Sequence, residues 1–191
     1  MGIIKYKLDR LLNNLEGSKK EVISKSLSDM PINKVKEYIS AFELGLKYSP
    51  ESKRENIIEK LFEIKPKYAK CYGEGLMWGL VYVDGDIKEK EMIIDSLLEK
   101  SATDARIYGY GLCLGLKYIP NEYKSKIAKI LLEKEPSEAK NCGIQIEQLL
   151  EWAYESKKNK RITEKEKLLK KVYKRKKDII AEILDIDKSE I

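Results

Sequence analysis

The chain of 191 residues contains no histidine, and this absence removes the chemistry that histidine usually provides. Imidazole is the usual general base of enzymes, the commonest zinc ligand, and the partner of serine and cysteine nucleophiles. Carboxylates are abundant, but their spacing follows the solvent-facing positions of helices rather than a paired acid and base. The sequence therefore favours a protein that is not an enzyme and that needs no metal and no cofactor.

Cysteine is also scarce, since the chain has only Cys71, Cys113 and Cys142. These three are too few and too evenly scattered for a disulfide framework or for a paired metal-ligand spacing. Cys71 lies beside a tyrosine and Cys113 lies between leucines, positions where cysteine packs as a small apolar side chain. We expect inert structural thiols and a reducing, cytoplasmic compartment.

Long apolar runs are missing as well. The longest uncharged run, Ile107–Leu116, has ten residues, well short of the roughly 18 that a membrane-spanning helix requires. The N-terminal segment Met1–Arg10 alternates apolar residues with charges and lacks the apolar block of a signal peptide. We expect no membrane partner.

Charge, in contrast, is plentiful and unevenly placed. Lysine and arginine number 38 against 32 acidic residues, which gives a net charge of +6. Residues 155–178 alone hold 12 basic and 4 acidic residues, whereas residues 1–154 hold 25 and 24. The excess of positive charge therefore belongs to one C-terminal segment, which has the apolar spacing of a long helix.

A sequence repeat runs through the middle of the chain. Residues 38–48 align with residues 72–82 and 108–118, at offsets of 34 and 36 residues, and a degenerate copy follows at 142–152. Stretches between these segments carry paired apolar residues at helical spacing, such as Ile57-Ile58 and Ile93-Ile94. Each repeat is therefore predicted to contain two helices, one from the aligned segment and one from the stretch that follows.

Small residues recur four positions apart in the first helix of each pair. They are Ala41 and Gly45, Gly75 and Gly79, and Gly111 and Gly115. A glycine inside a helix costs about 1 kcal/mol relative to alanine. Repetition of that cost in register predicts that neighbouring helices approach closely at these positions. We interpret the nearby Gly73 and Gly109 as packing glycines too.

These patterns predict one all-α domain over residues 1–191. We expect a right-handed superhelix of about four to five antiparallel helix pairs with a repeat of 34–36 residues. Residues 1–31 form an N-terminal pair, residues 32–65, 66–101 and 102–136 form the repeats, and residues 137–191 form a degenerate repeat with a long basic helix.

A two-helix repeat of this length, with Gly-Leu-x-Tyr closing the first helix, resembles the tetratricopeptide family over about residues 32–152. The motif is present at Gly45–Tyr48, Gly79–Tyr82 and Gly115–Tyr118. The second helices carry isoleucine and leucine pairs where that family has small residues, so a Sel1-like geometry, a HEAT-like geometry and a repeat particular to this chain are alternatives. The resemblance implies a scaffold that binds a segment of a partner protein on its concave face.

The repeat register places one basic residue at the same position of each first helix. This column consists of Lys36, Lys70, Arg106 and Lys140. It suits an acidic peptide, a C-terminal carboxylate or a phosphate as ligand, and the alternative interpretation is that these residues only solvate one end of the stack. Met77, Tyr110 and Lys117 lie on the same predicted stripe and complete the candidate site. Both tryptophans, Trp78 and Trp152, are expected to be core anchors.

The basic C-terminal helix supports an alternative function, which is nucleic-acid binding. Its candidate residues are Lys170, Lys171, Lys174, Arg175 and Lys177. Lysine and arginine on one helix supply phosphate contacts that do not depend on base sequence.

Overall fold

The computed structural model describes residues 2–84, 87–155 and 162–190, and within them the chain is helical with no strand, which confirms the all-α class. The helices are α1 (Gly2–Leu12), α2 (Gly17–Ser28), α3 (Ile32–Leu46), α4 (Glu51–Glu63), α5 (Pro66–Leu80), α6 (Ile87–Leu98), α7 (Ala102–Leu116), α8 (Asn121–Glu133), α9 (Pro136–Glu155) and α10 (Ile162–Leu184), followed by a 3-10 turn at Lys188–Glu190. Among these residues, no helix has both the length and the apolar character of a membrane span.

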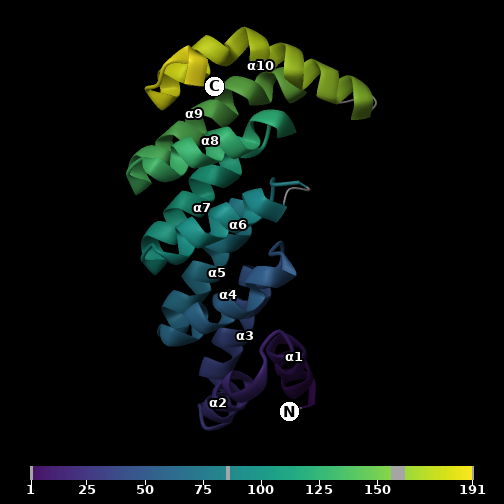
Figure 1. Ribbon diagram of the computed structural model, residues 1–191, viewed down its shortest axis with the longest axis vertical. Coiled ribbons are helices and arrows are strands. Elements are labelled where there is room, and N and C mark those ends of the chain that lie inside the picture. The colour runs from purple at the N-terminus through teal and green to yellow at the C-terminus, as the bar shows by residue number, and fades with distance from the viewer. Residues whose placement is uncertain (1, 85–86, 156–161, 191) are drawn as a thin grey trace.

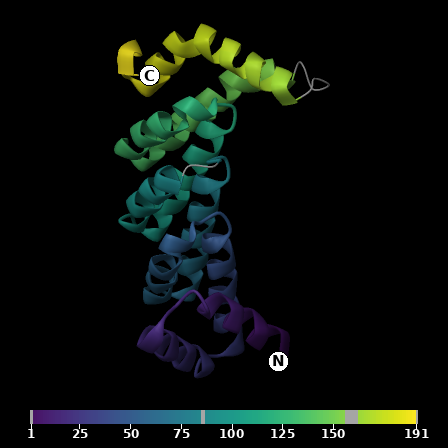
Figure 2. The ribbon, with the colours of Figure 1, turned by 45° about the vertical axis from the view of Figure 1, so that its right-hand side comes forward.

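The helices stack into an elongated molecule with the two ends of the chain far apart (Figure 1). Helices α3, α5, α7 and α9 pack closely on one another in that order and form the odd-helix layer. Helices α4, α6 and α8 lie side by side against them as the even-helix layer (Figures 1 and 2). At the C-terminal end, α10 packs on α9.

All five prolines lie at the starts of helices. Pro31, Pro50 and Pro120 are the N-caps of α3, α4 and α8, and Pro66 and Pro136 are the first residues of α5 and α9. Proline suits these positions because its fixed backbone angle matches the first turn, where no N–H is needed. The same residues end the preceding helix, so the chain reverses over a short connection.

Glycines bring the helices of the odd-helix layer into backbone contact. A Cβ atom at Gly109 would overlap the carbonyl oxygen of Gly75, and one at Gly143 would overlap the carbonyl oxygen of Gly111. Backbones this close allow Cα–H groups to contact carbonyl oxygens of the next helix. The predicted close approach is therefore confirmed at Gly75 and Gly111, and Gly109 takes part in it.

The other glycines of the pattern face the even-helix layer. A Cβ atom at Gly79 would lie 3.1 Å from Cδ1 of Leu97 in α6, and one at Gly45 would lie 3.0 Å from Cδ1 of Leu61 in α4. At Gly115 the nearest atom would be Cδ1 of Leu131 in α8, at 2.9 Å. Helices α3, α5 and α7 thus each use one small position against the next odd helix and another against the following even helix.

Tyrosine hydroxyls donate hydrogen bonds to carbonyls at the C-terminal ends of the even helices. The hydroxyl of Tyr38 donates to the carbonyl of Ile64 at 2.7 Å, and Tyr72 and Tyr108 donate likewise to the carbonyls of Leu97 and Lys134. The last carbonyls of a helix lack partners within that helix, and these bonds supply a donor to the carbonyls of Ile64 and Lys134 and a second donor to the carbonyl of Leu97, which also accepts from the N–H of Lys100. In α9 the thiol of Cys142 takes this role, because it donates to the carbonyl of Ile183 at 3.1 Å.

We expect Tyr72→Phe to destabilise the fold by about 1 kcal/mol, because it removes the buried hydrogen bond from the hydroxyl to the carbonyl of Leu97, which keeps only the N–H of Lys100 as a donor. Tyr173→Phe is the matched control, since the buried hydroxyl of Tyr173 has no hydrogen-bond partner among the described residues. The control should leave stability unchanged or raise it. Urea unfolding of both variants tests this, and equal losses would contradict the assigned role of the Tyr72 hydroxyl.

Alkaline pH should lower the stability of the fold through the buried hydroxyl of Tyr72. Burial raises the pKa of Tyr72 above its ordinary value of 10.0, so the folded protein holds a proton that the unfolded chain releases. The stability that depends on this proton is present below about pH 10 and is lost as pH rises above it. Tyr72→Phe should remove its share of that loss.

Candidate binding face

The predicted basic column lies on the odd-helix layer in a constant register. Lys36, Lys70, Arg106 and Lys140 are each the fifth residue of their helix, and all four are exposed. Among the residues that the structure describes, Arg106 forms an ion pair, with Glu74, and the three lysines of the column form none. The column therefore presents positive charge to solvent along four neighbouring helices.

A cavity of about 260 Å³ opens in the middle of this face. It is lined by Trp78 of α5, Arg106, Ile107 and Tyr110 of α7, and Lys140 of α9. The rings of Trp78 and Tyr110 meet edge to face, with centroids 5.6 Å apart and planes at 66°, which is a favourable geometry for an aromatic pair. Three consecutive odd helices thus contribute to one apolar recess.

Two cations border the aromatic pair. The guanidinium of Arg106 lies 5.6 Å from the ring centroid of Trp78, and Nζ of Lys140 lies 5.7 Å from that of Tyr110. Both distances suit a cation held at the face of a ring. Nε of Arg106 also lies 2.9 Å from a carboxylate oxygen of Glu74 on α5, which fixes the direction of the arginine.

The structure brings three of the seven predicted site residues together, which are Arg106, Tyr110 and Lys140. Met77 is half-buried and does not line the cavity. The neighbouring Trp78 does line the cavity. The prediction that Trp78 is a core residue is wrong, because its side chain is half-buried and lies at the recess. Trp78 follows Glu74 by four residues, so both lie on the same face of α5. This spacing could have placed Trp78 on the binding face. The side chain of Trp152 lies outside the described residues.

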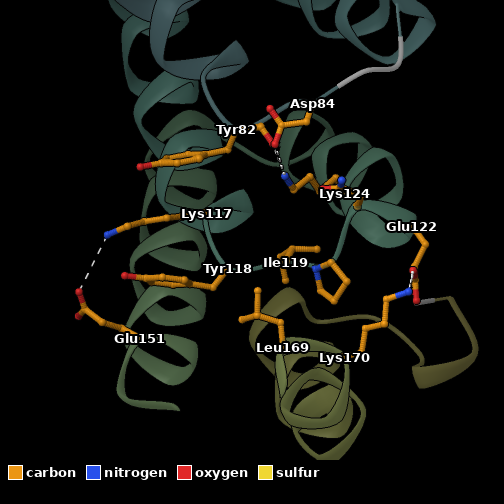
Figure 3. A pocket seen from close by; sticks show the side chains of 12 residues that line it. Tyr82, Asp84, Lys117, Tyr118, Ile119, Glu122, Lys124, Glu151, Leu169 and Lys170 are labelled. Carbon is orange, nitrogen blue, oxygen red and sulfur yellow. Dashed lines mark hydrogen bonds and ion pairs between the residues drawn. The ribbon is translucent and has the colours of Figure 1, made fainter. Parts of the chain in front are cut away.

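The remaining predicted residue, Lys117, belongs to a different part of the face. Its Nζ lies 2.8 Å from Glu147 and 4.0 Å from Glu151, both on α9. It lines a larger cavity of about 580 Å³, where the end of α7 and the start of α8 meet α9 and α10 (Figure 3). Lys117 therefore ties α7 to α9 and does not extend the aromatic recess.

The lysines that line the larger cavity all face carboxylates (Figure 3). Lys124 is buried, donates to the carbonyl of Tyr82 and lies 3.7 Å from Asp84. Burial lowers the pKa of Lys124, with Asp84 acting in the opposite direction. Nζ of Lys170 on α10 lies 2.7 Å from Glu122 on α8. Because its positive charges are matched locally, this cavity is a structural junction more than an anion site.

The alternative nucleic-acid residues differ in their surroundings. Lys171, Lys174 and Arg175 are exposed on α10, and Lys177 is half-buried. Lys170 is exposed too, but its pairing with Glu122 attaches α10 to α8. Residues 156–161 of the basic segment lie outside the described part of the chain.

Comparisons with protein-family models, with curated proteins and with solved structures find no match. In the part of the chain that the structure describes, no group of three or more acidic or cysteine side chains is arranged to hold a metal ion. Burial raises the pKa of the Cys113 and Cys142 thiols, which lowers their thiolate content and reactivity.

Proposed function

We propose that this chain is a non-enzymatic interaction scaffold that binds a segment of a partner protein on the face of its odd-helix layer. The recess between Trp78 and Tyr110, with Arg106 and Lys140 at its border, carries this proposal. Tryptophan, tyrosine and arginine are the residues most often found where binding energy concentrates in protein interfaces. The free cysteines support a reducing, cytoplasmic compartment as part of the proposal.

As part of this proposal, we infer that α3–α4, α5–α6 and α7–α8 are repeats of a right-handed, tetratricopeptide-like superhelix with the odd helices on its concave side. The tyrosine bonds support equivalence of the pairs, because Tyr38, Tyr72 and Tyr108 each reach the end of the following helix. The glycine contacts between successive odd helices support it too.

The charges of this face favour a protein segment over a polyanion. The stripe consists of the four column residues and the positions four, seven and eleven residues after each of them. It holds six cations and four carboxylates: Lys36, Lys47, Lys70, Arg106, Lys117, Lys140, Glu43, Glu74, Glu147 and Glu151. Three of the carboxylates form ion pairs at 2.8–2.9 Å, those of Glu43, Glu74 and Glu147. Carboxylates placed among the cations disfavour a long continuous row of phosphates, whereas a short peptide can place its few charged groups beside the cations alone.

Selection of displayed random peptides on the immobilised protein tests the proposal. We expect enriched peptides whose binding is lost in Tyr110→Ala and in Arg106→Ala. Lys129→Ala is the matched control, because Lys129 is an exposed lysine of α8, in the other layer. Failure to enrich any peptide, or binding that survives both changes, would contradict a peptide-binding face here.

The alternative proposal is that α10 binds nucleic acid through Lys171, Lys174 and Arg175. Their joint exposure on two turns of one helix supports it. Titration of labelled single-stranded RNA and of duplex DNA tests this alternative, and retention of affinity when Lys171 and Lys174 are both changed to glutamine would count against it.

A further inference from the structure

The recess has the size of one large apolar side chain. A cavity of about 150 Å³ in a protein core is enough to bind benzene, so about 260 Å³ gives room for a phenylalanine or leucine side chain. A ring that enters meets Trp78 and Tyr110, which already sit edge to face. Aromatic and aliphatic groups both gain from burial against such a pair.

Two cations lie beside the recess, where the residues that flank the apolar residue of a bound peptide would lie. Arg106 and Lys140 come from adjacent helices, and each lies near the face of one ring of the pair. Arg106 uses Nε for Glu74, and a guanidinium carries five N–H donors in all. Lys140 forms no ion pair with the residues that the structure describes. Both cations are exposed and therefore within reach of carboxylates on a ligand.

The geometry points to an acidic peptide segment with one bulky apolar residue as the occupant of this face. The apolar side chain enters the recess between Trp78 and Tyr110, and carboxylates on either side of it meet Arg106 and Lys140. This inference rests on the proposed function and deepens it, because it names the chemistry of the segment. The exposed Lys70 of the neighbouring helix extends the same positive strip toward α3.

Three labelled peptides of equal length test the inference with the full chain. The first contains Glu-Glu-Phe-Glu-Glu between flexible Gly-Ser ends, the second replaces Phe with Ala, and the third replaces each Glu with Gln. Fluorescence anisotropy at fixed salt should show the first binding tightest. We expect each change to weaken binding by about tenfold, which corresponds to about 1.4 kcal/mol.

A double-mutant cycle makes the test specific to the recess. Trp78→Ala should weaken binding of the Phe peptide by about tenfold and leave binding of the Ala peptide unchanged. Arg106→Gln should weaken the Glu peptide and leave the Gln peptide unchanged. Because Arg106 is an exposed residue, this second variant keeps the test valid if Trp78→Ala fails to fold. Thermal unfolding of both variants controls for stability.

The outcomes separate this inference from the proposed function. Equal binding of the Phe and Ala peptides to the original protein would overturn the inference. It would also be overturned if Trp78→Ala weakened binding of the Phe peptide and binding of the Ala peptide by the same factor. Displayed peptides that need Tyr110 but lack an acidic and apolar pattern would overturn it while the scaffold stands. Single-stranded RNA that binds the recess and displaces the Phe peptide would overturn both.

Discussion

Gly109→Ala should destabilise the fold by about 3 kcal/mol, the largest effect we expect from a single added methyl group. The new Cβ atom would overlap the carbonyl oxygen of Gly75 on the neighbouring helix. Backbone atoms on both sides of the contact belong to packed helices, so relief requires α5 and α7 to move apart. The gain of about 1 kcal/mol in helix propensity from glycine to alanine offsets only part of this cost.

Gly79→Ala is the matched control, because it adds the same methyl group on α5 with the same gain in propensity. Its Cβ would lie 3.1 Å from a methyl group at the end of the Leu97 side chain, which can shift. We therefore expect stability within about 1 kcal/mol of the original protein. Urea unfolding followed by circular dichroism gives the free energy of unfolding of both variants. Similar losses in the two would show that α5 and α7 are not in backbone contact at Gly109 and Gly75.

These backbone contacts also bear on the binding face. Arg106 reaches Glu74 and Trp78 on the preceding odd helix, and Lys140 reaches Tyr110 on the preceding one in the same way. Such contacts across helices require a fixed register between neighbours. The glycine seam supplies that register, since a small sideways shift would bring side chains of one helix against the backbone of the next.

The helices and their close approach could be predicted because both follow from local patterns. Apolar spacing identifies a helix, and a glycine repeated in register at a cost to helix stability identifies a contact. The pattern did not show which neighbour each glycine meets. Gly75 meets an odd helix and Gly79 meets an even one, a difference set by how the helices cross.

The candidate site was predicted only in part, for a related reason. The register of the basic column depends on sequence position alone, and the structure places Arg106 and Lys140 at that register. The recess depends on side chains that lean across helices, so Trp78 was assigned to the core. Lys117 and Lys170 were assigned to ligand binding, yet each pairs with a carboxylate far along the chain, Glu147 and Glu122. Such long-range pairs leave no spacing signal in the sequence.

Reversal of two charges on each candidate surface should separate the two functional proposals. We expect Lys70→Glu with Arg106→Glu to weaken binding of the acidic Phe peptide by about thirtyfold or more, since each lost cationic contact is worth about 1 kcal/mol. Reversal at Arg106 adds repulsion, because it sets a second carboxylate beside Glu74. The matched variant, Lys171→Glu with Lys174→Glu on α10, should leave that binding unchanged.

The design leaves Lys170 untouched, because its ion pair with Glu122 holds α10 against α8 and a reversal there would disturb packing. Salt dependence supplies the second readout. Nucleic-acid binding that neutralises about four phosphates should make log K fall with log salt at a slope of roughly −3 to −4. A peptide in the recess should show a shallower slope, because burial of its apolar side chain is insensitive to screening. Binding that is steep in salt and lost only in the α10 variant would favour nucleic acid and reject the peptide-binding face.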